Sequence, residues 1–89
     1  MSENVVSEKS MDFAVRIVRL YQYLSEEKKE YILSKQLLRS GTSIGANIKE
    51  ALQGQSKNDF TAKMSISLKE AVETEYWLDL LYKTGYLAE

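Results

Sequence analysis

The stretch Gln-Leu-Leu-Arg-Ser-Gly-Thr-Ser-Ile-Gly-Ala-Asn-Ile-Lys-Glu-Ala-Leu-Gln-Gly, residues 36–54, decides the fold of this 89-residue chain. Its apolar residues recur at helical spacing on one face: Leu37, Ile44, Ile48 and Leu52. Its first half is made of small residues, which let a neighbouring backbone come close: Ser40, Gly41, Ser43, Gly45 and Ala46. Each glycine costs about 1 kcal/mol of helix propensity relative to alanine, so close packing must offset the two glycines. We predict a central, tightly packed helix, either continuous or kinked near Gly41.

The composition excludes several classes of function. The chain has no cysteine, no histidine and no proline. It therefore lacks thiolate and imidazole ligands and the commonest general base, so we expect no enzyme, no metal site and no cofactor. The absence of proline suits long helices. With a net charge of −1, attraction to nucleic acid requires a local cluster of basic residues.

Two further helices are predicted, one on each side of the central stretch. In the first, Ser10 opens the helix, residues 1–9 are flexible, and an apolar stripe faces the core: Phe13, Ile17, Leu20 and Leu24. Ser25 is the predicted N-cap of the central helix, followed by acidic residues in its first turn. Gly54 is the predicted residue just after the end of the central helix, at the position that helices often give to glycine.

The third helix is predicted to begin at Ser56, which with Asp59 matches the signature of a helix start. Gly85 is its predicted stop. Its expected core stripe is made of apolar residues at helical spacing: Phe60, Met64, Leu68, Ala71, Leu78 and Tyr82. Short polar loops between long helices give an all-α, antiparallel up-and-down bundle in a single domain, residues 1–89. Three such helices carry more apolar surface than so small a domain hides, so we expect a homo-oligomer.

Residues 33–51 resemble the bacterial four-helix-bundle family of 23S rRNA intervening-sequence proteins, which is related to the accessory variability protein of diversity-generating retroelements. The resemblance continues through residues 13–18, 56–60, 63–71 and 73–78 in the same order. It implies an antiparallel four-helix bundle that assembles into a homopentamer. Family members usually continue into a fourth helix after the Gly-Tyr segment at residues 85–86. Either that helix is absent from this chain, or the central helix breaks near Gly41 and supplies the extra element.

A basic surface is one candidate site. It would combine side chains of the first and central helices, repeated around an oligomer: Arg16, Arg19, Lys35, Arg39 and Lys49. The alternative is a set of ordinary solvated helix faces. The retroelement proteins are said to bind nucleic acid and a reverse transcriptase through a basic surface, but this chain has no comparable basic excess.

A second set of residues is predicted to pack closely or to form a subunit interface: Gly41, Gly45, Ile66, Glu75, Trp77 and Leu80. Glu75 falls within the apolar stripe, so it needs a partner such as Arg39 or Asn47, or else it faces another subunit. No run of apolar residues approaches the roughly 20 needed to cross a bilayer, and the first residues lack the apolar segment of a signal peptide. We expect a cytoplasmic bacterial protein with no membrane association and no small-molecule substrate.

These observations leave two functional hypotheses. The first is a non-enzymatic, oligomeric helical scaffold whose assembled surface binds RNA, DNA or a nucleic-acid-processing protein. The second is a structural or protein-interaction module with no role in nucleic-acid binding.

Overall fold

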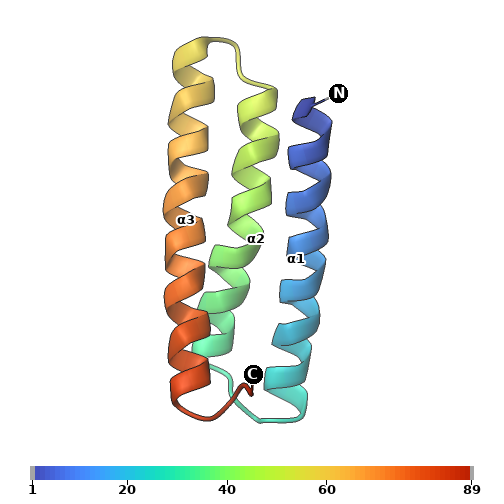
Figure 1. Cartoon of the computed structure of the whole chain (residues 1–89), viewed down its shortest axis with the longest axis vertical. Coiled ribbons are helices and arrows are strands. Elements are labelled where there is room, and N and C mark those ends of the chain that lie inside the picture. The colour runs from blue at the N-terminus through green and yellow to red at the C-terminus, as the bar shows by residue number, and fades with distance from the viewer. Residues whose placement is uncertain (1, 89) are drawn as a thin grey trace.

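The structure is a computed structural model that describes the backbone of residues 2–88 and the side chains of residues 5–88. The described chain consists of three helices and contains no strand (Figure 1). Helix α1 spans Ser2–Glu26, α2 spans Leu33–Leu52, and α3 spans Lys57–Lys83. The prediction of an all-helical fold is confirmed.

Helix α1 begins at Ser2 and not at Ser10. Ser10 is buried within the helix, and its hydroxyl donates a hydrogen bond of 2.8 Å to the Ser7 carbonyl oxygen. The segment 2–9 is helical as well, its expected flexibility stays a prediction, and Met1 lies outside the described residues. A buried serine that bonds to its own helix resembles a capping serine in sequence, which explains the wrong start.

The prediction that Ser25 caps the central helix is also wrong. Ser25 lies in the last turn of α1, where its hydroxyl donates a hydrogen bond of 2.9 Å to the Tyr21 carbonyl oxygen. The chain instead turns at Lys29, whose φ of 57° is the left-handed conformation. Helix α2 starts only at Leu33.

Helix α2 is one uninterrupted helix, so Gly41 does not divide it into two elements. Its C-cap is Gln53, and Gly54 follows at the position predicted for it. Ser56 is the N-cap of α3, as predicted, because its hydroxyl oxygen accepts a hydrogen bond of 3.1 Å from the Asp59 backbone N–H. Gly85 follows the C-cap of α3 with a φ of +89°, which glycine adopts without strain.

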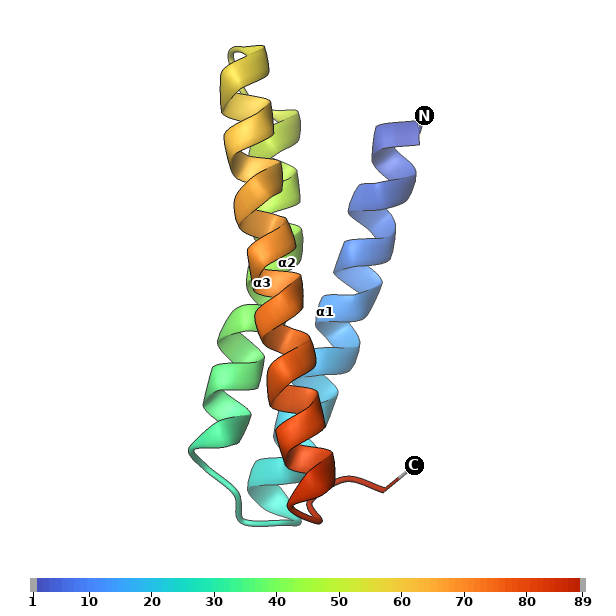
Figure 2. The ribbon, with the colours of Figure 1, turned by 60° about the vertical axis from the view of Figure 1, so that its left-hand side comes forward.

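Helix α2 lies between the other two and packs against both (Figure 1). No pair of Cα atoms in the described parts of α1 and α3 lies within 8 Å of each other. Figure 2 shows α1 diverging from α2 and α3 toward its N-terminal end. The two outer helices are therefore joined mainly through α2.

The buried apolar core lies near the end of the molecule where α1 connects to α2. Four buried side chains from all three helices form it: Ile17, Leu24, Leu37 and Leu81. The expected stripe of α1 is correct in that Ile17 and Leu24 are buried and its other two members pack around them.

The expected core stripe of α3 is wrong for three of its six members, while Leu78 packs against the core. The buried residues of this helix are Ser67, Thr74 and Leu81, seven positions apart. Leu68 is 67 % exposed, and Phe60 and Tyr82 are also exposed. Apolar residues lie all around α3, so hydrophobicity alone does not identify the face that meets α2.

None of the helices in the described part of the chain is long and apolar enough to cross a bilayer.

Candidate interaction surface

The small residues of α2 are in close contact with α1. A Cβ atom added to Gly41 would lie 2.8 Å from both Cγ1 and Cγ2 of Ile17. A Cβ atom on Gly45 would lie 3.1 Å from the Ser10 hydroxyl oxygen. Glycine at these two positions allows α1 to approach α2 over two turns.

On its other side, α2 meets α3 through buried hydroxyl groups. Thr74 Oγ1 donates a hydrogen bond of 2.9 Å to Ser40 Oγ and lies 2.8 Å from the Glu70 carbonyl oxygen. Seven residues before Thr74 in α3, Ser67 Oγ donates a hydrogen bond of 2.9 Å to the Ile44 carbonyl oxygen of α2. These contacts fix how far α2 and α3 are shifted along each other.

The five residues of the predicted basic surface are all exposed: Arg16, Arg19, Lys35, Arg39 and Lys49. The structure does not bring them together as one site. Lys49 lines a hollow between α1 and α2, and Arg19 lines an adjoining hollow on α1 that shares Met11 and Ala14 with it. Arg39 turns toward α3, where it forms ion pairs with Glu70, at 3.3 Å, and with Glu73.

The ion pairs of Arg39 change its suitability for binding an anion. Hydrogen bonding to Glu73 raises the pKa of Arg39 above its ordinary value. The pKa of Glu73 is lowered, first by a hydrogen bond from the Trp77 indole N–H and then by one from Arg39. The ion pairs with Glu70 and Glu73 offset the Arg39 charge, so Arg39 contributes less to a positive surface than its exposure suggests.

Glu75 is exposed and does not pair with Arg39 or Asn47, which were its expected partners. Thr74 occupies the buried position beside it. Of the other predicted interface residues, Ile66 is exposed, while Trp77 and Leu80 are half-buried. The remaining expectation for Glu75, that it faces another subunit, stays a prediction.

Glu30 caps α2, a role that was not predicted from the sequence. Its buried carboxylate accepts hydrogen bonds from three backbone N–H groups at the start of the helix: Ile32 at 3.1 Å, Leu33 at 2.9 Å and Ser34 at 2.7 Å. Burial raises the pKa of Glu30, but the three backbone hydrogen bonds outweigh it and the net pKa is lowered. A carboxylate at a helix N-terminus also interacts favourably with the helix dipole.

Two exposed apolar stripes were likewise not predicted. The stripe on α1, which we call the α1 stripe, consists of residues spaced at four and three positions: Met11, Val15 and Val18. The stripe on α3, the α3 stripe, consists of residues spaced at four positions: Leu68, Val72 and Tyr76. The helical spacing of both stripes is visible in the sequence, but Leu68 was predicted to belong to the core stripe of the third helix.

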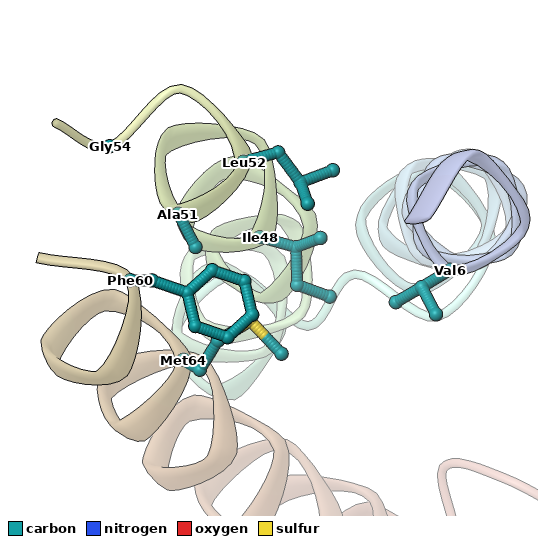
Figure 3. Close-up of a pocket in the computed structure, with 7 residues that line it drawn as sticks. All are labelled: Val6, Ile48, Ala51, Leu52, Gly54, Phe60 and Met64. Atoms are coloured by element: carbon teal, nitrogen blue, oxygen red, sulfur yellow. The ribbon is translucent and has the colours of Figure 1, made fainter. Parts of the chain in front are cut away.

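A third apolar feature is an open hollow of about 520 Å³ near the end of the molecule opposite the core. Figure 3 shows Val6 of α1 on one side and Ile48, Phe60 and Met64 of the other two helices facing it. Val6 belongs to the N-terminal part of α1, which diverges from the other two helices (Figure 2). Among the described residues, no group of three or more acidic side chains is arranged to hold a metal ion.

The chain is similar to known proteins over its whole described length. The sequence profile of one family, described as 23S rRNA-intervening sequence protein, matches residues 2–89. A crystal structure of a protein with unknown function from the S23 ribosomal protein family of Bacteroides thetaiotaomicron VPI-5482 is 62 % identical. The match covers 100 % of this chain and 80 % of that one, with a TM-score of 0.98. No curated protein matches the chain.

Proposed function

The chain belongs to the family of 23S rRNA-intervening sequence proteins, and we propose that it is a non-enzymatic helical scaffold that assembles with copies of itself and binds nucleic acid through the assembled surface. The observation that supports assembly is the large amount of apolar surface left uncovered. The core has few buried apolar side chains, whereas the α1 stripe and the α3 stripe are both exposed. Contiguous exposed apolar surface on a small domain usually marks an interface with another protein.

The arrangement of basic residues supports binding of a polyanion by an assembly better than by one chain. Lys35 and Lys49 are exposed on α2 and have no ion-pair partner among the described side chains. Two lysines give little attraction to a phosphate backbone in a protein with a net charge of −1. Copies repeated around an axis would place several such pairs along one strand and so strengthen the attraction.

The proposal includes the finer expectations that the family resemblance carries: an antiparallel four-helix bundle, a homopentamer and a relation to the retroelement accessory protein. It also includes the cytoplasmic location expected from the sequence. The contacts support antiparallel order, because residue numbers fall along α2 as they rise along α3. Ser67 of α3 meets Ile44, and Thr74 meets Ser40. The hollow beside Val6 and Phe60 is an apolar surface that a fourth helix would cover.

A second candidate function is a structural or protein-interaction module with no role in nucleic-acid binding. The observation in its favour is the pairing of Arg39 with Glu70 and Glu73, which offsets the charge of one member of the predicted basic surface. The two candidates differ in their response to salt, because releasing counterions from nucleic acid makes such binding weaker as salt rises.

The deciding experiment measures binding of fluorescent single-stranded and double-stranded RNA and DNA by polarisation at several salt concentrations. We expect salt-sensitive binding by the native chain and a loss of roughly tenfold or more in the Lys35→Glu/Lys49→Glu variant, since each phosphate contact adds to the salt-dependent free energy. The matched control is Lys28→Glu/Lys57→Glu, which changes the net charge equally at exposed positions elsewhere.

Equal weakening by both double variants would show that only net charge matters and would remove the α2 surface from the proposal. No binding by the native chain at low salt, with an intact oligomer in light scattering, would favour the protein-interaction module. A well-folded single chain at micromolar concentration would contradict the assembly itself.

A further inference from the structure

Val15 of the α1 stripe and Val72 of the α3 stripe lie on the sides of their helices that face away from α2, whereas Met11 borders the hollow between α1 and α2. On α1, Ile17 and Ser10 face α2, and the stripe residue Val15 is about half a turn from them around the helix. On α3, Thr74 and Ser67 face α2, and Val72 is likewise on the opposite side. The exposed fractions are 47 % for Val15 and 61 % for Val72.

The two stripes also lie at the same height along the molecule. Ser10 is next to Gly45, whose neighbour Ile44 meets Ser67, so Ser10 and Ser67 are level. In the same way, Ile17 is next to Gly41, whose neighbour Ser40 meets Thr74, so Ile17 and Thr74 are level.

In both pairs the α3 residue follows the α1 residue by 57 positions. The same offset makes Met11 level with Leu68 and Val15 level with Val72. A copy placed beside the first with its long axis parallel would bring stripe against stripe without any shift along the axis.

We propose that the α1 stripe of one copy packs against the α3 stripe of the next copy, with both helices running in the same direction. This inference rests on the proposed self-assembly and specifies its interface. Because the two surfaces differ, each copy uses one of them on each side, which is a heterologous contact that closes into a ring or continues as a filament.

Charges at the edges of the stripes are complementary. Arg19 follows Val15 by four positions and so borders the α1 stripe. Glu75 and Asp79 border the α3 stripe, and neither has an ion-pair partner among the described side chains. By the same offset, Arg19 is level with Tyr76, between the two carboxylates.

In this arrangement, Arg19 of one copy lies opposite Glu75 and Asp79 of the next copy. The proposal moves Arg19 from the predicted nucleic-acid surface to the subunit interface.

The first test uses two variants that each break one surface, Val15→Glu and Val72→Glu, with Ile32→Glu as the control. Ile32 is 75 % exposed in the loop before α2 and belongs to neither stripe. Circular dichroism checks that all three variants remain helical.

By light scattering after gel filtration, the native chain and the Ile32→Glu variant should be oligomers. Each stripe variant should be a single chain of 10.2 kDa. Mixed together, the two stripe variants retain one intact interface, so they should form a one-to-one dimer and nothing larger.

The second test uses cysteine cross-linking, which is clean because the natural sequence contains no cysteine. Under oxidation, the Val15→Cys/Val72→Cys variant should give a ladder of covalent oligomers on a non-reducing gel. The single variants Val15→Cys and Val72→Cys should not, because residues of the same kind do not face each other in this arrangement.

The outcomes separate this inference from the proposed function. If the native chain is monomeric, both the proposed self-assembly and this interface are wrong. If the native chain assembles but Val15→Glu and Val72→Glu leave its mass unchanged, only this interface is wrong, and another element covers the stripes. Loss of assembly in one stripe variant alone, or cross-linking by one single-cysteine variant, would show a symmetric contact between like stripes and overturn the α1–α3 pairing.

Discussion

Gly41 of α2 and Ile17 of α1 are packed so closely that a single methyl group on Gly41 would lie 2.8 Å from two carbon atoms of the isoleucine side chain. Ile17 is only 3 % exposed and belongs to the core, so it has little room to move. The separation of α1 and α2 is therefore determined by the absence of a side chain at this position.

We predict that Gly41→Ala destabilises the protein. Alanine improves helix propensity by about 1 kcal/mol, but overpacking a core costs about 1–3 kcal/mol, so the free energy of unfolding should fall. Urea unfolding measures the change. In the Ile17→Ala background the clashing carbons are gone, and Gly41→Ala should then be neutral or stabilising. A higher stability of Gly41→Ala alone would contradict the close contact.

The cap formed by Glu30 should make stability depend on pH. Because its pKa is lowered in the folded protein, the stabilisation is present above its unfolded value of about 4.5 and is lost as the pH falls through the folded value. Replacing Glu30 with alanine should cost about 1–2 kcal/mol near neutral pH. Unfolding in urea at pH 7 and at pH 3 should show a smaller loss for the variant at the lower pH. Glu27→Ala, in the exposed loop, is the control and should follow the native profile.

The buried hydrogen bond between Thr74 and Ser40 should contribute measurably to the α2–α3 contact. Thr74→Val keeps the shape of the side chain and removes the hydroxyl, which should lower stability by about 0.5–1.5 kcal/mol. Ser40→Ala should have a similar effect. The double variant should lose less than the sum of the two, since the hydroxyls are partners in one contact. If the losses in free energy of unfolding of the two single variants simply add in the double variant, each hydroxyl acts through its own helix alone.

If nucleic acid binds near Arg39, removing its carboxylate partners should strengthen the interaction. Glu70→Gln/Glu73→Gln leaves hydrogen-bond acceptors for Arg39 and Trp77 but no longer offsets the arginine charge. We expect tighter RNA binding and a steeper dependence on salt than in the native chain. The control, Glu26→Gln/Glu27→Gln, changes net charge equally at the end of α1. An equal gain in both would exclude a specific role for Arg39.

The sequence predicts the helices where a local signal exists. Ser56 and Asp59 identify the start of α3 because a capping hydroxyl acts within one turn. Ser25 has the same residue type but bonds to its own helix, and the real cap of α2 is Glu30, which reaches forward from a loop. Its role depends on the left-handed turn at Lys29, which no sequence pattern indicated.

The face of α3 that meets α2 was not predictable from apolar spacing. It is lined by hydroxyl-bearing Ser67 and Thr74, which pair with α2, while Leu68 and Val72 remain outside. Small polar residues are favoured there because they let two helices come close and still satisfy their hydrogen bonds.

The predicted basic residues are at the surface, but only a three-dimensional arrangement reveals that Arg39 is already paired.

Helix α2 is the one helix of the described chain with a neighbour along both flanks, and this has a consequence for the order in which the protein opens. Amide protons in the first turns of α1, beside the divergent end, should exchange with deuterium soonest, because few contacts must break to expose them (Figure 2). Those of α2 should exchange last, since either outer helix can detach while the other still protects it.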